Sequence, residues 1–375
     1  MMSPELDVII IGAGVVGLAI ANELASTNLE VCVFESNRTF GLETSSHNSE
    51  VIHSGIYHAA NTMKGKFCLE GKPLTYELCE RYQVGYKRIG KIIIAADEAE
   101  ERELERLYKQ GVDNGLNDLQ MLTRQDVKKL EPNVKAIAGL LSPSTGIIDA
   151  YGYARSFYGR AQEQGASFLF NSEVIGIDKI AGGYIVSVKD REGISSIATK
   201  AVINAAGLYS DKVAALAGID IAGAGYRIHY CKGFYYCLSP RLGCPVNRLV
   251  YPVPEEAGLG IHITMSVDGR VRLGPNFRYV EAVDYGVDDK DKTDFYNAAC
   301  RYMPSIAPDD LAPESAGIRP KLQGQGEGFR DFVIRDEADK GLPGLIDLIG
   351  IESPGLTGSP SIAKYVAGLV RQYLE

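Results

Sequence analysis

Three glycines close to the start of the chain have the spacing of a phosphate-binding turn. Gly12, Gly14 and Gly17 fit the pattern G-x-G-x-x-G, in which each glycine has its own task. The first allows a tight turn, the second lets the backbone approach a pyrophosphate, and the third lets a helix pack closely on a strand. Because a side chain at Gly14 would hold a phosphate away, the motif predicts a dinucleotide site.

An acidic residue narrows the choice of nucleotide. Glu35 ends the apolar stretch after the motif, close to the offset of about 20 residues at which a carboxylate accepts hydrogen bonds from a ribose 2′-hydroxyl. The same carboxylate would repel a 2′-phosphate, so NADP is disfavoured. The glycines and the acid together leave FAD and NAD as alternatives.

A polar loop follows, with side chains that suit a phosphate or a sugar chain. Within residues 44–49 there are four hydroxyls and one amide, all short hydrogen-bonding groups. Three of the five histidines, His47, His53 and His58, lie in the same stretch, and such clustering of titratable groups predicts a site. Their spacing matches no ligand motif, so we expect no metal.

Strands and helices that could position these residues can be read from the apolar pattern. Residues 7–11, an aspartate followed by four β-branched residues, are typical of a strand buried on both faces. A helix follows the glycines, and residues 29–35 form a second strand. Two more strands end in glycine turns, at residues 201–207 and 348–358. A helix predicted over residues 361–374 would direct the positive end of its dipole at an electron-rich group.

The rest of the chain indicates a second domain. Residues 226–280 are rich in strand-forming residues and turn signals, which predicts an antiparallel sheet with His262 in the middle of a strand. Residues 97–115 predict a charged helix with Leu104, Leu107 and Val112 on its buried side. Three glycine-ended strands far apart in the chain therefore suggest one sheet into which a second domain is inserted.

Length and composition exclude several classes of protein. The chain has 375 residues, 45% of them hydrophobic, and a net charge of −9, which argues against binding to nucleic acid. It has no apolar run of about 18 residues that could span a membrane. Seven scattered cysteines without a C-x-x-C pair favour a reducing compartment, and the acidic N-terminus does not fit a signal peptide. We therefore expect a cytoplasmic protein.

The order of these motifs resembles the FAD-dependent oxidoreductase superfamily that includes D-amino acid oxidase, glycine and sarcosine oxidases and glycerol-3-phosphate dehydrogenase. Within it, residues 48–57, 63–71, 206–211, 273–276 and 317–319 are similar to the L-2-hydroxyglutarate dehydrogenases and oxidases. Glu50, His58 and Glu352 depart from the pattern of that group. These departures bear on the substrate more than on the cofactor.

The resemblance implies FAD as the cofactor and an α/β fold, α+β overall, in which a Rossmann-like FAD-binding domain carries an inserted antiparallel-sheet substrate domain. The FAD-binding domain would comprise residues 1–85, 145–222 and 320–375, and the substrate domain residues 86–144 and 223–319. The predicted cofactor-binding residues are Gly12, Ala13, Gly14, Val15, Val16, Gly17, Glu35, Ser36, Thr44, Ser45, Ser46, Asn48, Ser49, Glu50, Val174, Ala206, Gly207, Pro354, Gly355, Leu356 and Thr357.

The resemblance also implies an enzyme that oxidises a small 2-hydroxy acid such as L-2-hydroxyglutarate, with the hydride passing to flavin N5 and electrons to oxygen or a quinone. Arg319 stands where the superfamily binds the substrate carboxylate, a task that its planar fork suits. His53 and His262 are both candidates for the base that takes the hydroxyl proton. Candidates for binding a distal anionic group are Tyr57, Lys64, Tyr251 and Lys232.

Other functions remain open at this point. The same geometry would suit oxidation at a C–N bond, as in an amine, D-amino acid or N-methylglycine oxidase, or a glycerol-3-phosphate dehydrogenase. A non-catalytic protein that keeps FAD for stability is a further alternative. Beyond the small-molecule substrate and the electron acceptor we expect no nucleic-acid partner, but a peripheral contact with the inner face of a membrane is open.

Overall fold

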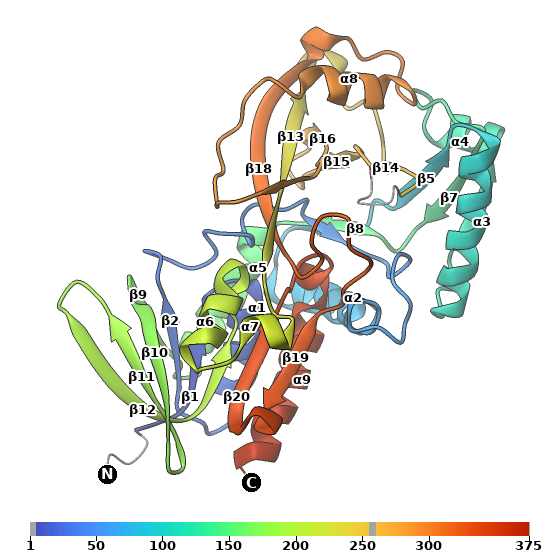
Figure 1. The fold of residues 1–375 in the computed structure, drawn as a ribbon. Coiled ribbons are helices and arrows are strands. Elements are labelled where there is room, and N and C mark those ends of the chain that lie inside the picture. The colour runs from blue at the N-terminus through green and yellow to red at the C-terminus, as the bar shows by residue number, and fades with distance from the viewer. Residues whose placement is uncertain (1–4, 255–259, 375) are drawn as a thin grey trace.

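Two large β-sheets organise the chain in the computed structural model, which describes residues 5–254 and 260–374. One sheet has eight strands and the other nine, and a small three-stranded sheet lies with them. Figure 1 shows the eight-stranded sheet at the end of the molecule that holds both termini, and the nine-stranded sheet at the opposite end. The predicted fold class, a mixed α/β protein with parallel and antiparallel sheets, is confirmed.

The eight-stranded sheet is built from segments far apart in the chain. Its parallel strands pair in the order β9, β2, β1, β12, β20, and antiparallel strands flank them. Strand β1 is buried on both faces because alternate residues enter different cores: Val8 and Ile10 one, Ile9 and Ile11 the other. The strands are β1 (Leu6–Ile11), β2 (Val31–Glu35), β9 (Ser167–Phe170), β10 (Glu173–Ile180), β11 (Gly183–Lys189), β12 (Ile194–Asn204), β19 (Val333–Glu337) and β20 (Leu342–Ile349).

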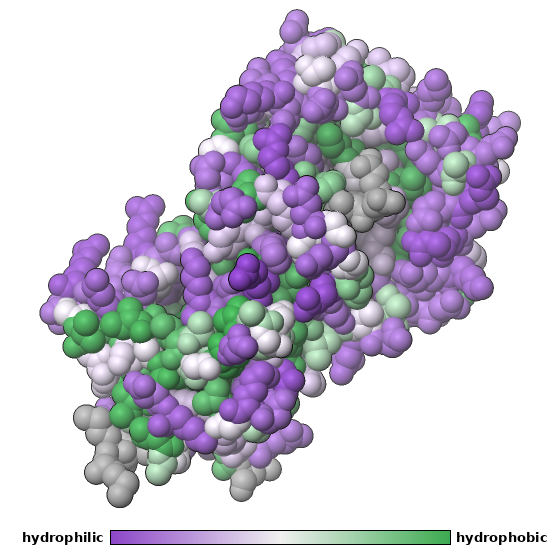
Figure 2. Space-filling view, viewed as in Figure 1, coloured by the Kyte–Doolittle hydropathy of each residue, from purple (hydrophilic) through white to green (hydrophobic). Residues whose placement is uncertain are grey.

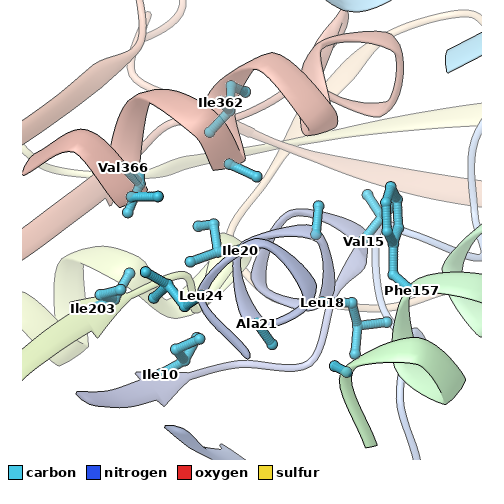
Figure 3. Close-up of a cluster of buried hydrophobic side chains, with 14 of the residues drawn as sticks. Ile10, Val15, Leu18, Ile20, Ala21, Leu24, Phe157, Ile203, Ile362 and Val366 are labelled. Atoms are coloured by element: carbon cyan, nitrogen blue, oxygen red, sulfur yellow. The ribbon is translucent and has the colours of Figure 1, made fainter. Parts of the chain in front are cut away.

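Helices cover both faces of this sheet. Helix α1 lies against the sheet, and Figure 3 shows Ile362 and Val366 of α9 directed at Ile20 and Leu24 of α1. The helices on this face are α1 (Val15–Ala25), α2 (Met63–Tyr82), α5 (Ala150–Glu163) and α9 (Gly355–Leu374). The other face is covered by α6 (Ser210–Leu216) and α7 (Ile221–Ala224).

The nine-stranded sheet lies above the ends of these strands in Figure 1 and has its own core. Its pairs are antiparallel, as predicted for residues 226–280, except that β14 runs parallel to β5 from the earlier part of the chain. Its strands are β5 (Lys91–Ala95), β6 (Gln120–Thr123), β7 (Ala138–Ser142), β13 (His229–Leu238), β14 (Leu249–Pro252), β15 (Ile263–Met265), β16 (Val271–Leu273), β17 (Arg278–Val280) and β18 (Leu311–Lys321). The accompanying helices are α3 (Glu98–Asp113), α4 (Arg124–Leu130) and α8 (Lys292–Cys300).

Short strands and long loops fill the space between the two sheets. The three-stranded sheet consists of β3 (Val51–Ile52), β8 (Gly146–Ile148) and β4 (Tyr86–Lys87). Strand β18 extends from the nine-stranded sheet toward the polar loop, where the Thr44 hydroxyl donates to the Ile318 carbonyl. The loop that carries the predicted hydroxyls is thereby fixed between the two sheets.

Three local expectations differ from the structure. Helix α9 begins at Gly355, well before residue 361, and the Ser359 hydroxyl donates to the Leu356 carbonyl, which Pro360 cannot serve because it has no N–H. Val112 of α3 is 46% exposed and so does not belong to the buried side with Leu104 and Leu107. His262 lies just before β15 and not in mid-strand, although its carbonyl still accepts from Gly274.

Candidate active site

The glycine motif forms a turn between β1 and α1 that only glycine fits. Gly12 has a φ of +105°, and a Cβ there would lie 2.6 Å from the Ala205 carbonyl oxygen. A Cβ on Gly17 would lie 2.1 Å from the Gly12 carbonyl oxygen. Helix α1 therefore starts close to the ends of β1 and β12, as a phosphate-binding turn requires.

A first cavity, which we call the glycine-motif cavity, opens beside this turn. Glu35 lies in its wall, with Oε2 accepting from Ala13 N at 2.8 Å and Oε1 from Asn37 N at 2.8 Å. The carboxylate is thus held as an acceptor at the end of β2. Of the predicted cofactor-binding residues, this cavity is lined by Gly12, Gly14, Glu35, Ser36, Thr44, Ser45, Val174, Ala206 and Gly207.

A second cavity, the middle cavity, adjoins the first and shares Gly14, Thr44, Ser45 and Gly207 with it. The Ser45 hydroxyl accepts from Val15 N at 2.9 Å, so it stands at the N-terminus of α1 where an anion would also be stabilised. The N-terminus of α9 reaches the same cavity. Predicted residues in its wall are Gly14, Val15, Val16, Thr44, Ser45, Asn48, Ser49, Glu50, Gly207, Pro354, Gly355 and Leu356.

The third cavity, the histidine cavity, contains the predicted chemical groups. It shares Ser49, His53, Arg319 and Pro354 with the middle cavity, so the three cavities follow one another through the molecule. Residues from the polar loop, β5, β14, β18 and the segment before β15 meet here. Six predicted catalytic or substrate-binding residues line it: His53, Tyr57, Lys64, Tyr251, His262 and Arg319.

Four predicted cofactor-binding residues do not line a cavity. Ala13 and Gly17 serve the turn itself, through the hydrogen bond to Glu35 and the close packing described above. The Ser46 hydroxyl donates to the Glu43 carbonyl within its own loop. Thr357 is buried in α9, where its hydroxyl donates to Val51 O and accepts from His53 N, so it positions the loop.

Arg319 is the cation at the junction of the middle and histidine cavities. Its guanidinium contacts Cys231 Sγ at 3.8 Å and the Asn276 carbonyl at 3.5 Å, and within the described part of the chain no carboxylate pairs with it. A guanidinium offers parallel donors that match a carboxylate. Arg319 can therefore bind an anionic group placed between the two cavities.

The two histidines face the site in different ways. His53 lines both the middle and the histidine cavity, and its Nε2 lies 3.2 Å from the Ser353 hydroxyl. His262 lines only the histidine cavity; its Nδ1 must donate to the Gly260 carbonyl at 3.0 Å, which leaves Nε2 as a buried acceptor without a partner among the described residues. Burial lowers the pKa of each imidazole to about 3, so both are neutral acceptors at neutral pH.

A buried lysine that the sequence reading missed also lines the histidine cavity. Lys91, the first residue of β5, is 1% exposed; its Nζ donates to the Tyr57 hydroxyl at 3.1 Å and lies 4.2 Å from the Tyr57 ring centre and 4.9 Å from that of Tyr251. Burial lowers the pKa of Lys91 to about 7. The contact with each aromatic ring face stabilises the ammonium by about 0.5–2 kcal/mol, which is less than the several kcal/mol that burying an ammonium costs.

The sequence offered little sign of this lysine. Gly90 and Lys91 precede three isoleucines, and a lysine at the start of an apolar strand usually reaches solvent. Only the fold, which lays β14 and Tyr57 against the side chain, makes it a buried group.

The two lysines that were predicted from the sequence, Lys64 and Lys232, already have acidic partners. Lys64 Nζ lies 2.8 Å from Glu352 Oε1, and Lys321 lies 3.3 Å from the same atom. Glu352, one of the departures from the family pattern, is buried, which raises its pKa, but the two lysines outweigh this and keep the pKa below the ordinary value. Lys232 pairs with Asp284 at 2.8 Å and lies outside the three cavities.

The residues of the first two cavities fit FAD. A Cβ on Gly14 would lie 3.2 Å from Ser45 Oγ, so a side chain there would crowd that hydroxyl, whereas a Cβ on Gly207 would meet nothing within 4 Å, so the wall leaves open space beside that backbone. Two helix N-termini, those of α1 and α9, reach the middle cavity, and Glu35 stands at the sheet edge. These are the features of a protein that binds a dinucleotide at the carboxyl ends of the strands of a parallel sheet.

Comparisons with known proteins agree with this class. The family model described as FAD dependent oxidoreductase matches residues 7–369, so the chain belongs to that family and is an FAD-dependent oxidoreductase. The L-2-hydroxyglutarate dehydrogenase of Arabidopsis thaliana is 36% identical, over 97% of this chain and 83% of that protein. The glycerol 3-phosphate dehydrogenase of Caloramator mitchellensis is 32% identical, over 97% of this chain and 74% of that protein.

A solved structure is similar over almost the whole chain. The dithionite-reduced L-alpha-glycerophosphate oxidase of Mycoplasma pneumoniae, with FAD bound, has a TM-score of 0.86 and 28% identity, and the match covers 99% of this chain and 95% of that one. The resemblance to this superfamily and the FAD cofactor, both expected from the sequence, are confirmed.

Figure 2 shows mostly hydrophilic residues, with apolar ones concentrated over the end that holds the eight-stranded sheet. Among the described residues, no helix combines the length and apolar character needed to cross a membrane, and no three potential metal ligands cluster. The seven cysteines all lie in the described ranges, and none forms a disulfide.

Proposed function

We propose that this oxidoreductase converts a small 2-hydroxy acid, of the size and charge of L-2-hydroxyglutarate, to the 2-oxo acid. The observation that carries the proposal is Arg319, a guanidinium without an acidic partner among the described residues, at the junction of the middle and histidine cavities. FAD, when bound, accepts the hydride from the substrate carbon. The name of the Arabidopsis relative supports a 2-hydroxy acid as the substrate.

Arg319 and His53 would then divide the work on the substrate. The guanidinium binds the carboxylate through two parallel hydrogen bonds and so fixes the neighbouring carbon at the middle cavity. We assign the base that takes the hydroxyl proton to His53, because it is the histidine that lines both cavities. Burial keeps this imidazole neutral, although the same lowering of its pKa weakens it as a base. His262 would orient the substrate or a water molecule through its bare Nε2.

The predicted cofactor residues and the domain division belong to the same proposal. The backbone and hydroxyl groups of the glycine-motif and middle cavities would hold FAD, and Arg319 and the N-terminus of α9 lie in the wall of the middle cavity. The division into an FAD-binding domain and a substrate domain is supported by the two sheets, whose strands follow the predicted ranges except that β18 runs across the last boundary to Lys321.

The electron acceptor and the cellular site complete the proposal. We propose oxygen or a quinone as the acceptor and the cytoplasm, or a peripheral position at the inner face of a membrane, as the location. Seven unpaired cysteines support a reducing compartment. Steady-state assays with oxygen and with a soluble quinone would separate the two acceptors.

One experiment tests the substrate class. The FAD-loaded protein is mixed anaerobically with L-2-hydroxyglutarate, with other 2-hydroxy acids, with glycerol 3-phosphate and with amino acids, and the flavin absorbance is followed. We expect bleaching by a 2-hydroxy acid. Bleaching by glycerol 3-phosphate alone would favour a second candidate function, the oxidation of glycerol 3-phosphate, which the names of the Caloramator and Mycoplasma relatives support. Bleaching by amino acids alone would contradict both functions.

A further inference from the structure

Lys91 is a charged group that the proposed reaction leaves without a role. It is almost completely buried, it lines the histidine cavity, and no carboxylate within the described ranges pairs with it. A buried ammonium is retained when something compensates its charge. Since the protein groups found around it are neutral, the compensating charge is expected from a ligand of the cavity.

The hydrogen bond between Lys91 and Tyr57 shows how such a ligand would be held. Nζ donates to the Tyr57 oxygen at 3.1 Å, because an ammonium can only donate, and the hydrogen of the phenol is therefore available to another acceptor. Two further N–H groups of Lys91 remain. Tyr57 itself lines the cavity, so its hydroxyl and the ammonium present donors on one side of it.

Arg319 and Lys91 are both within electrostatic reach of His262. Each of them contributes to lowering the pKa of this imidazole, after the larger effect of burial. The cavity thus contains two cations on different strands, β18 and β5, that act on the same histidine. The other cations of the cavity each have an acidic partner: Lys64 and Lys321 share Glu352, and Arg106 pairs with Glu103.

We propose that Lys91 and Tyr57 form a second anion-binding subsite, which takes a second acidic group of the substrate while Arg319 binds the first. The inference rests on the proposed function and deepens it: the substrate is a dianion. A carboxylate and a phosphate are both suitable for the second group, since an ammonium and a phenol donate to either. The subsite selects against substrates that carry one acidic group.

Equilibrium binding to the FAD-loaded protein tests the subsite without turnover. The probes are glutarate, a dicarboxylate without an oxidisable hydroxyl, and glutaramate, in which an amide replaces one carboxylate; calorimetry at pH 6.5 gives the dissociation constants. We expect Lys91→Met to weaken glutarate at least about 30-fold and glutaramate no more than about threefold. Tyr57→Phe should weaken glutarate by a smaller factor, about 5- to 10-fold.

Several outcomes would overturn the subsite. Equal losses for glutarate and glutaramate in Lys91→Met would mean a general structural defect, and unchanged glutarate binding in both variants would mean that the second acid binds elsewhere. Glu255 and Glu256 lie outside the described residues, so Glu255→Gln/Glu256→Gln is included as a check. Glutarate binding that tightens more than about tenfold in this variant would assign Lys91 an internal acidic partner and reject the proposal.

The probes also distinguish the ligand source and the underlying reaction. Glycerol 3-phosphate carries one acidic group, so dependence of its binding on Lys91, without such dependence for glutarate, would reject a subsite for a second acid and assign Lys91 to a lone phosphate. Lys91-dependent binding of glutarate together with no flavin bleaching by any 2-hydroxy acid would support the subsite and reject the proposed oxidation. Thermal unfolding of Lys91→Met without ligand serves as the control for folding, and a melting temperature within a few degrees of wild type is expected.

Discussion

The two ends of the cavity system are built in different ways. The glycine-motif end includes the backbone of Gly12, Gly14 and Gly207, and the carboxylate of Glu35 in its wall already accepts hydrogen bonds from two backbone N–H groups. The histidine end is made of long titratable side chains from several elements, and its cations Arg319 and Lys91 pair with no carboxylate in the described part of the chain. At the first end the backbone already sets the shape of the site, whereas the second end holds positive charge that an anionic ligand would balance.

The largest effect should come from a substitution that changes the shape of the glycine turn at the cofactor end. In Gly12→Ala the new Cβ would lie 2.6 Å from the Ala205 carbonyl oxygen, at a φ of +105° that alanine rarely adopts. We expect FAD affinity to fall about 100-fold or more, equal to at least about 2.7 kcal/mol. The flavin-to-protein absorbance ratio after gel filtration measures this.

A matched glycine provides the control for that experiment. A Cβ on Gly159 of α5 would meet nothing within 4 Å, so Gly159→Ala should keep its FAD and unfold at or slightly above the wild-type temperature. If Gly12→Ala retains FAD as well as Gly159→Ala does, the turn is not the binding element that its shape indicates.

At the other end, substitution should change substrate binding and leave the cofactor in place. Arg319→Lys keeps the positive charge but loses the planar fork, so at least one charged hydrogen bond, worth about 1.5–3 kcal/mol, is lost. We expect kcat/KM for a 2-hydroxy acid to fall about 100-fold at unchanged FAD content. The exposed Arg301, which pairs with Glu100 at 2.8 Å, gives the control Arg301→Lys, which should have wild-type kinetics.

The difference between the two ends also predicts that pH changes the affinity for an anionic ligand at the histidine end. Burial lowers the pKa of Lys91 to about 7, and an anion binds the charged form, so glutarate affinity should be full below pH 7 and fall up to about tenfold per pH unit above it. Calorimetry between pH 6 and 9 measures this, and Lys91→Met should show no such slope. A flat wild-type profile would contradict the assignment. The facing groups stay neutral over this range, because burial lowers the pKa values of His53 and His262 and raises those of Cys68, Tyr57 and Tyr251.

The same difference explains what could be predicted from the sequence. The cofactor end depends on local requirements, a positive φ at Gly12 and a polar loop after Glu35, which leave a readable spacing in the chain. Arg319 and His53 were found through resemblance to a family. Lys91 was missed because its burial arises from strand pairing with β14, and the pairing of Lys64 with Glu352 joins residues far apart in the chain. Contacts of that range leave no local pattern.

The smallest expected effect concerns an acid on the cofactor side that does not line the cavities. Asp347 of β20 is buried; its Oδ1 accepts from Asn204, and Glu337 lies near enough to act on it. Burial raises the pKa of Asp347, the hydrogen bond from Asn204 opposes this, and the negative charge of Glu337 adds to it. The folded protein therefore holds a proton that the unfolded chain releases, and stability is lost as pH rises through the raised value.

Asp347→Asn removes this titration while keeping an acceptor for Asn204. The melting temperature of the variant minus that of wild type should increase by about 2–4 °C between pH 5 and pH 8, since each unit of pKa shift corresponds to about 1.4 kcal/mol. Because Asp347 lies behind the cavity wall, kcat/KM should change less than about twofold. A pH-independent difference in melting temperature would mean that Asp347 does not titrate in this range. A large kinetic effect would mean that this carboxyl belongs to the chemistry, so that titratable groups matter on the cofactor side as they do at the histidine end.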